Sequence, residues 1–194
     1  MKGKTARHVF HVVAGAIPPL LGFVLPREWL LVFLGVVAGI FVLAEVLRLT
    51  VEPVNRWLIS LFSRASKEFK EHESRRPIGS TYFLVASFLT FLFFPRDVAI
   101  AALLFAAVGD AMAAAVGESF GRTRLGTRSL EGTAAFFFSA LVIGLILIFA
   151  GLRLSFAAVA VGALVAALTE LLSIPIDDNL TIPLVSAIPI ALLS

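Results

Sequence analysis

The chain has 194 residues, of which 59% are hydrophobic and only 15% charged, and its mean hydropathy is +1.00. So little polar surface excludes an ordinary water-soluble domain and predicts a single membrane-embedded domain over residues 1–194. Cysteine is absent and the three histidines, His8, His11 and His72, all lie in the first half, which excludes disulfide or thiolate chemistry and a histidine-rich metal site.

Apolar segments follow one another along the chain. They cover residues 8–25, 28–48, 79–95, 97–118, 132–151, 154–174 and 180–194. Each is long enough for a helix that crosses most or all of the hydrocarbon core. We therefore expect an all-α integral membrane protein with about seven transmembrane helices. The third and the last are short for a core about 30 Å thick, which implies local thinning or burial against neighbouring helices.

Basic residues concentrate on one side of the expected membrane. Of the 16 lysines and arginines, 13 fall in the N-terminal segment, the 48–79 connection and the loop after the fourth helix. Only Arg27, Arg96 and Arg153 fall on the other side. The positive-inside rule therefore places the N-terminus, this connection and this loop in the cytoplasm, and the C-terminus outside. The first apolar segment has no convincing small-residue cleavage site, so we expect it to be retained.

The basic connection carries an amphipathic pattern. Its apolar residues recur at three- and four-residue steps: Val54, Trp57, Leu58, Leu61, Phe62, Ala65 and Phe69. This pattern predicts an interfacial helix between the second and third transmembrane helices. A membrane-surface anchor is the simpler role for such a helix, and a platform beside a lipid entrance is the alternative.

Asp110, within the fourth apolar segment, is the residue that most indicates an active site. An ionisable side chain near the centre of a membrane helix costs about 2.5–3.5 kcal/mol on insertion scales, so it usually has a function. Gly109, Ala113, Gly117 and Gly121 follow a four-residue step around it. Small residues at this spacing allow close helix packing, and beside a carboxylate they also leave room for a polyphosphate and its metal. Packing explains the glycines but not the acid, so we expect Asp110 to be functional.

Arginines and a helix-start sequence follow this segment. They are Arg122, Arg124, Arg128, Ser129, Glu131, Gly132 and Thr133. Guanidinium groups suit phosphate oxygens, and a helix N-terminus adds backbone N–H groups and the positive end of its dipole. The combination predicts an anion cradle, although a basic cytoplasmic loop is also what the topology alone requires.

Acidic residues return before the last helix. Asp177, Asp178 and Asn179 lie where a helix cap is expected, and a cap needs only one of them. Two adjacent carboxylates opposite an arginine loop suit Mg²⁺ ligation or a base near an alcohol.

Two further glutamates lie inside apolar segments. Glu170 is embedded near the end of the sixth segment, and Glu45 precedes Arg48 by three residues. That spacing lets one helix face pair Glu45 with Arg48. A structural pair and a functional role both stay open for Glu45.

Five motifs occur in an order that resembles the CTP-dependent lipid kinases, which include dolichol kinase, phytol and farnesol kinases and the CTP-using diacylglycerol kinase. They are R-x-x-x-H (Arg7, His11), R-R-P-x-G (Arg75 to Gly79), G-D-x-x-A-x-x-x-G-x-x-x-G-R (Gly109 to Arg122), S-x-E-G-T (Ser129 to Thr133) and D-D-N-L-T-I-P (Asp177 to Pro183). The resemblance spans nearly the whole chain. The family often has lysine where this chain has His8 and Arg128, and both of these keep a potential donor.

The resemblance implies transfer of the γ-phosphate of CTP to a lipid alcohol with a divalent metal, Mg²⁺. In the mechanism that we expect, Asp110 with Asp177 or Asp178 holds Mg²⁺, and another carboxylate or His11 accepts the alcohol proton. The expected nucleotide- and phosphate-binding residues are Arg7, His8, Gly117, Arg122, Arg128, Ser129, Glu131, Gly132, Thr133 and Asn179. The expected partners are CTP, membrane lipids and a polyprenol, dolichol, phytol-like alcohol or diacylglycerol, without nucleic acid.

Two other classes of protein compete with this interpretation. A CTP:phospholipid cytidylyltransferase would make a CDP-lipid, but that family carries a Gly-His-Gly-Gly and further acids towards its C-terminus. This chain has no histidine after His72 and no acid after Asp178. A small transporter or assembly subunit would spread acids through the bilayer depth as a relay, whereas Glu45, Asp110 and Glu170 all lie towards the cytoplasmic ends of their segments.

Overall fold

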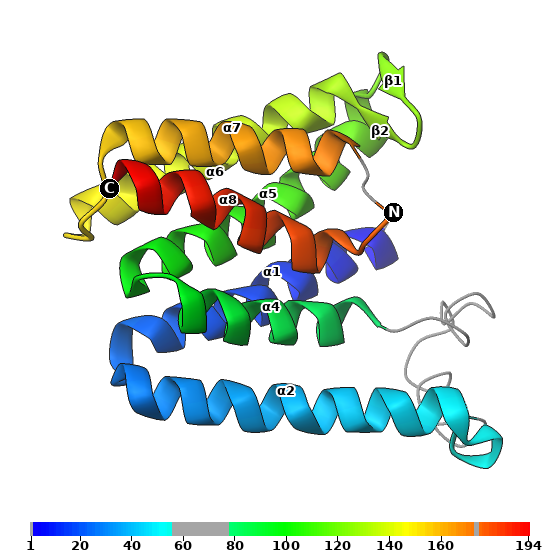
Figure 1. Cartoon of the computed structure of the whole chain (residues 1–194). Coiled ribbons are helices and arrows are strands. Elements are labelled where there is room, and N and C mark those ends of the chain that lie inside the picture. Colours follow the sequence, from blue (N-terminus) through cyan, green and yellow to red (C-terminus); the bar gives the residue numbers. More distant parts are fainter. Residues whose placement is uncertain (1, 56–77, 173–174) are drawn as a thin grey trace.

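The computed structural model describes residues 2–55, 78–172 and 175–194, with side chains from residue 12 onward (Figure 1). Within these ranges the chain is helical apart from one short β-hairpin. The helices are α1 (Lys2–Val24), α2 (Arg27–Thr50), α4 (Gly79–Phe93), α5 (Arg96–Phe120), α6 (Leu130–Phe149), α7 (Phe156–Leu172) and α8 (Asp178–Leu193). The expected all-α class is confirmed, and each apolar segment forms a helix whose ends lie within a few residues of those expected. Only α1 begins clearly earlier.

Three of the described helices, α2, α5 and α6, are long and apolar enough to cross a membrane. Shorter apolar helices accompany them: residues 12–24 of α1, and α4, α7 and α8. The expected interfacial helix lies mainly in residues 56–77, outside the described residues, although residues 52–55 at its start are helical.

Helix α5 forms the centre of the bundle. In its most apolar stretch 72% of the residues are buried, against 22% in α2 and 28% in α6. It packs against α1, α6, α7 and α8, whereas α2 lies at the edge of the bundle and packs mainly against α4 (Figure 1). Helix α5 also carries Asp110, the acid for which the sequence predicts a functional role.

Close packing of α5 on α6 depends on a glycine. Gly109 is buried, and a Cβ added there would lie 2.5 Å from Cε1 of Phe136. The Phe136 ring is fully buried between the helices. The glycine therefore lets α6 approach the helix turn that carries Asp110.

We expect Gly109→Ala to lower the thermal midpoint of the detergent-solubilised protein, by an amount equivalent to about 1–3 kcal/mol, because overpacking forces a buried ring to move. Gly39→Ala is the matched control, since a Cβ at Gly39 meets nothing within 4 Å. Alanine there should leave the midpoint unchanged or raise it. Equal midpoints for the two variants would contradict the packing role of Gly109.

The end of the bundle at which α2 and α5 begin is held by arginines. Arg27 donates to the carbonyl oxygen of Leu92 at 3.1 Å, and Arg96 donates to that of Gly22. Both carbonyls belong to the last turns of neighbouring helices, where they lack intrahelical donors. The charge pattern of the sequence places three arginines on the side opposite the expected cytoplasmic side. Two of them, Arg27 and Arg96, thus cap the C-terminal ends of α4 and α1.

A buried ion pair joins α2 to the start of α4. Glu45 and Arg48 are only 8% and 4% exposed, and the Arg48 Nε donates to Oε1 of Glu45 at 2.9 Å. The second oxygen, Oε2, accepts from the Thr81 hydroxyl at 3.1 Å and from the backbone N–H of Ile78 at 3.4 Å. The i, i+3 pair expected from the sequence is therefore present, and the same carboxylate also binds the N-terminus of the next helix.

Removing this shared carboxylate should destabilise the protein. We expect Glu45→Ala to cost about 3 kcal/mol, because one partner of a buried ion pair is lost and the α4 start loses an acceptor. The thermal midpoint in detergent measures this loss. Glu28→Ala is the control, since Glu28 is exposed at the opposite end of the same helix, and it should change the midpoint little. A Glu45→Ala protein as stable as the control would show that the pair is energetically neutral.

Candidate active site

One end of the bundle gathers the polar segments singled out in the sequence. The starts of α4, α6 and α8 and the ends of α2, α5 and α7 lie at the same end of the bundle as the β-hairpin (Figure 1). We call this the hairpin end. Asp110 lies about three helix turns before the end of α5, on the half of that helix nearest to the hairpin end.

The loop between α5 and α6 is a hairpin rather than an irregular connection. Strand β1 (Arg124–Leu125) pairs antiparallel with β2 (Arg128–Ser129), with Arg124 opposite Ser129 and Leu125 opposite Arg128. The two-residue turn needs a positive φ, which Gly126 supplies at 63° without steric cost. The hairpin fixes the register that aims Arg128 at α7 and α8.

Helix α6 begins where the S-x-E-G-T motif predicts. Ser129 is its N-cap, and the Ser129 Oγ accepts from the backbone N–H of Gly132 at 3.1 Å. Two glycines keep this turn close to α5: a Cβ at Gly132 would lie 2.8 Å from the Ala113 carbonyl oxygen, and one at Gly117 would lie 2.9 Å from the Ser129 Oγ. The small residues therefore serve close packing beside the cavity described below.

Arg128 is the centre of a charged cluster. Its Nη1 lies 3.1 Å from Oε1 of Glu170 on α7 and 4.0 Å from Oδ1 of Asp110 on α5. Its Nη2 pairs with Oδ2 of Asp178 on α8. We call these four residues the Arg128 cluster. Since its members come from four elements, the cluster ties α5, α7 and α8 to the hairpin.

Burial differs across the Arg128 cluster. Glu170 is only 2% exposed, whereas the Asp110 and Arg128 side chains are 31% and 27% exposed. The cluster carries three carboxylates and one guanidinium, an excess of negative charge that favours a second cation. Ligand access is possible from the Asp110 and Arg128 side because those groups reach solvent.

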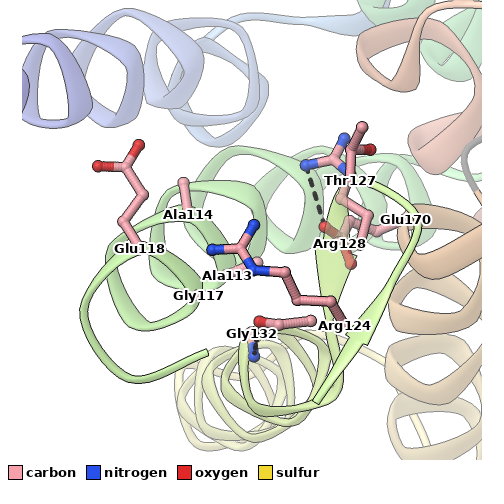
Figure 2. A pocket seen from close by; sticks show the side chains of 10 residues that line it. Ala113, Ala114, Gly117, Glu118, Arg124, Thr127, Arg128, Gly132 and Glu170 are labelled. Atoms are coloured by element: carbon pink, nitrogen blue, oxygen red, sulfur yellow. Dashed lines mark hydrogen bonds and ion pairs between the residues drawn. The ribbon is translucent and has the colours of Figure 1, made fainter. Parts of the chain in front are cut away.

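A cavity of about 160 Å³ lies against this cluster. Its described lining residues are Ala113, Ala114, Gly117 and Glu118 from α5, Arg124, Thr127, Arg128 and Ser129 from the hairpin, Gly132 from α6 and Glu170 from α7. Figure 2 shows Arg124 extending from the hairpin towards α5, and the ion pair between Arg128 and Glu170. Two arginines, hydroxyl groups and a helix start suit an anion of phosphate type.

Some expected site residues have other contacts. Glu131 accepts the backbone N–H of Thr123 at 3.1 Å and so closes the base of the hairpin. Asp177 is the N-cap of α8, and its Oδ1 accepts from the backbone and side-chain nitrogens of Asn179 at 2.9 and 2.8 Å. Arg122 is exposed and outside the lining of the cavity. Of the adjacent pair of acids, the structure uses Asp177 as the cap and directs Asp178 to Arg128.

Other expected residues cannot be placed at the site. Arg7, His8 and His11 lie on α1, but their side chains are outside the described residues. Residues 75–77 of the R-R-P-x-G motif also lie outside them. The glycine that ends this motif, Gly79, begins α4, and a Cβ there would lie 2.8 Å from Nδ2 of Asn179. The motif therefore reaches the start of α8.

The carboxylates of the site can be matched to Mg²⁺ only as a partial ligand set. No group of three His, Cys, Asp or Glu side chains that could hold a metal ion by itself occurs among the described residues. A magnesium ion on substrate phosphates needs only one or two carboxylates. Asp178 fits, because its Oδ1 is buried and has no hydrogen-bond partner among the described residues, and the Asp110 carboxylate lies across Arg128 from it.

The contribution of Glu170 to the site was not predicted. From the sequence, Glu170 was an embedded acid outside the expected site, whereas the structure puts it in contact with Arg128 and in the lining of the cavity. A buried acid near the end of an apolar helix, on the side of the arginine loop, was the available signal. The hairpin was also not predicted, although a glycine at the first position of a two-residue turn, as in Gly126-Thr127, is a hairpin signal.

No family model matches the chain, and no solved structure matches it. The chain is similar to a protein of Rickettsia prowazekii (strain Madrid E) described as "Uncharacterized protein RP860". The two are 28% identical over 181 residues, which cover 92% of this chain and 88% of that protein. The similarity thus extends over the hairpin end and the helices alike.

Proposed function

We propose that this protein is a multi-pass membrane enzyme that transfers the γ-phosphate of CTP to the hydroxyl of a lipid alcohol. The proposal is supported most by one observation: Arg128, flanked by Asp110, Glu170 and Asp178, lies against a cavity at one end of an apolar bundle. Phosphoryl transfer needs positioned cations and carboxylates more than covalent chemistry. The choice of CTP and of an alcohol comes from the family resemblance of the motifs.

The proposed topology has seven membrane helices with the hairpin end in the cytoplasm. The bias of basic residues supports this orientation, since the hairpin, the start of α1 and the connection before α4 are rich in lysine and arginine. It gives CTP access from the cytosol, while the lipid alcohol reaches the same end from within the bilayer. The proposed active site would therefore lie at the membrane surface.

In the proposed reaction the oxygen of the lipid alcohol attacks the γ-phosphorus. The bond from the γ-phosphorus to the β,γ-bridging oxygen breaks, and CDP leaves with that oxygen. The proton of the alcohol passes to a carboxylate of the site or to His11. Arg124 and Arg128 neutralise phosphate charge, and the α6 start that Ser129 caps orients backbone N–H groups towards it.

Asp110 and Asp178 are the carboxylates that would hold Mg²⁺. When bound, the ion supplies charge neutralisation on the β- and γ-phosphates. We retain these two rather than Asp177, because the Asp177 Oδ1 already accepts two hydrogen bonds at the start of α8.

The direct test is a transfer assay of the purified full-length protein with Mg²⁺ and CTP labelled separately at the γ- and α-phosphates. Polyprenols, phytol-like alcohols, diacylglycerol and phosphatidate serve as acceptors. Label in the lipid from γ-CTP alone is the expected result and would identify the alcohol. Label from α-CTP would instead indicate the cytidylyltransferase. If neither label enters any of these lipids while the protein stays folded, the kinase proposal fails.

A further inference from the structure

Glu170 is the most deeply buried acid of the Arg128 cluster. It is 2% exposed and lies in α7 among the fully buried Ala163, Ala166 and Ala167. Burying a carboxylate is costly unless charge and hydrogen bonds compensate it. Two groups do so here: the Arg128 Nη1 at 3.1 Å from Oε1, and the Thr133 hydroxyl at 3.2 Å from Oε2. Both oxygens are therefore occupied by groups of the hairpin and of α6.

Thr133 fixes the carboxylate from the other side. Its hydroxyl also lies 3.2 Å from the carbonyl oxygen of Ser129, the residue that caps α6. A hydroxyl has one proton to donate, so it can donate to either acceptor while its position between them stays fixed. Thr133 therefore links the first turn of α6 to Glu170, and Glu170 in turn contacts Arg128.

Glu170 and Asp110 compete for the same nitrogen of Arg128. Nη1 lies 3.1 Å from Glu170 and 4.0 Å from Asp110. Glu170 belongs to the lining of the cavity, whereas Asp110 and Asp178 are not among its described lining residues. The Arg128 guanidinium is thus shared between one carboxylate that lines the cavity and two that are not among its described lining residues.

We propose that Glu170, held by Thr133, is a positioning residue that keeps the Arg128 guanidinium at the cavity, where it binds the phosphates of the nucleotide. This role rests on the proposed function. Without the Glu170 charge, the guanidinium moves towards Asp110 and Asp178. The cavity then loses a phosphate donor, and Arg128 pairs more closely with Asp110. Removing a negative charge would by itself favour the binding of an anion. Here we expect weaker binding instead, because the position of the Arg128 guanidinium has the larger effect.

The experiment measures two quantities on the full-length protein in nanodiscs. Calorimetry gives the Kd of inorganic tripolyphosphate, which requires no transfer, and the γ-phosphate assay gives KM for CTP and kcat. The variants are Glu170→Gln, Thr133→Val, their combination, and the conservative Thr133→Ser. Thr169→Val is the matched control, because the Thr169 hydroxyl is buried on the same helix but bonds only to the carbonyl oxygen of Val165 among the described residues.

We expect Glu170→Gln to raise both Kd and KM about tenfold or more, the size expected for losing a charge-assisted hydrogen bond. The change in kcat should be smaller, as for lost ground-state binding. Thr133→Val should act in the same direction, and the double variant should be less severe than the product of the two single effects, because the residues act as a unit. Thr133→Ser keeps the hydroxyl, so its Kd and KM should lie between those of Thr133→Val and the wild type, whereas Thr169→Val should behave as the wild type does.

Three results would overturn the proposal. They are a Kd that falls or stays constant in Glu170→Gln, an equal effect of Thr169→Val, and a wild-type protein that does not bind tripolyphosphate. A wild type that binds tripolyphosphate but transfers no phosphate would refute the kinase alone. In that case the ratios of Kd would still decide the role of Glu170.

Discussion

Arg128→Met is expected to reduce γ-phosphate transfer by about 10³-fold, because a single arginine that neutralises a transferring phosphoryl group can supply that factor or more. The substitution keeps an unbranched apolar stem but removes the guanidinium and every donor. It also leaves the buried Glu170 carboxylate without its cation, so the thermal midpoint should fall together with the activity. The measurements are kcat/KM for CTP and the midpoint of unfolding in detergent.

Two further variants separate charge from folding at Arg128. Arg128→Lys keeps the positive charge, and members of the family that these motifs resemble often have lysine before this serine. It should therefore keep activity within about tenfold and stay folded, although one ammonium group cannot match the geometry of the guanidinium fork. Arg153→Ala, an exposed site at the opposite end of the bundle, should leave both quantities unchanged. If Arg128→Met keeps wild-type kcat/KM, Arg128 does not act on the phosphates.

Asp110→Asn should reduce transfer by about 10²–10³-fold without loss of stability. The amide cannot supply the charge that a divalent metal requires, but it keeps the shape of the side chain. Stability should hold because the Asp110 side chain is about one-third exposed and asparagine keeps its shape and an oxygen that accepts hydrogen bonds. Removing one of three mutually repelling carboxylates also relieves the cluster. Transfer kinetics and the thermal midpoint together give the two readouts.

Asp97→Asn is the matched control for Asp110→Asn. Asp97 lies in the first turn of the same helix, at the end opposite the hairpin, where its Oδ2 accepts the backbone N–H of Arg153 at 2.8 Å. An asparagine can accept the same hydrogen bond, so neither activity nor stability should change by more than a small factor. Equal losses in both variants would show a general sensitivity of α5 and would remove the argument for Asp110.

The helices could be predicted because their signal is local. Runs of apolar residues bounded by Pro26, Pro95 and the Asp177 turn define α2, α5 and α8 to within a few residues, and a helix satisfies its own backbone hydrogen bonds. The Glu45–Arg48 pair was also accessible, since three residues separate its members on one helix. The hydrogen bonds from Thr81 and Ile78 to Glu45 could not be predicted, because they join α2 to the start of α4.

At the site, too, local features could be predicted from the sequence, whereas contacts between separate elements could not. Local sequence marked Asp110, Arg128 and the capped start of α6 as candidates, and it offered two adjacent acids before α8 without distinguishing them. Only packing separates their contacts: Asp177 turns back to cap its own helix, while Asp178 faces a guanidinium 50 residues earlier in the chain. The small residues around Asp110 were open to two interpretations, and at Gly109 and Gly117 the structure shows close contact with α6 and its cap.

The sequence by itself determined the apolar helical class, the helix positions and the gathering of charge in a few segments, because composition and periodicity are properties of neighbouring residues. The tertiary structure alone decided that Glu170, Asp178 and Asp110 meet on Arg128, with a cavity beside them. These contacts join residues from four separate elements. Their distances depend on how α5, α7 and α8 pack, which no local pattern of residues encodes.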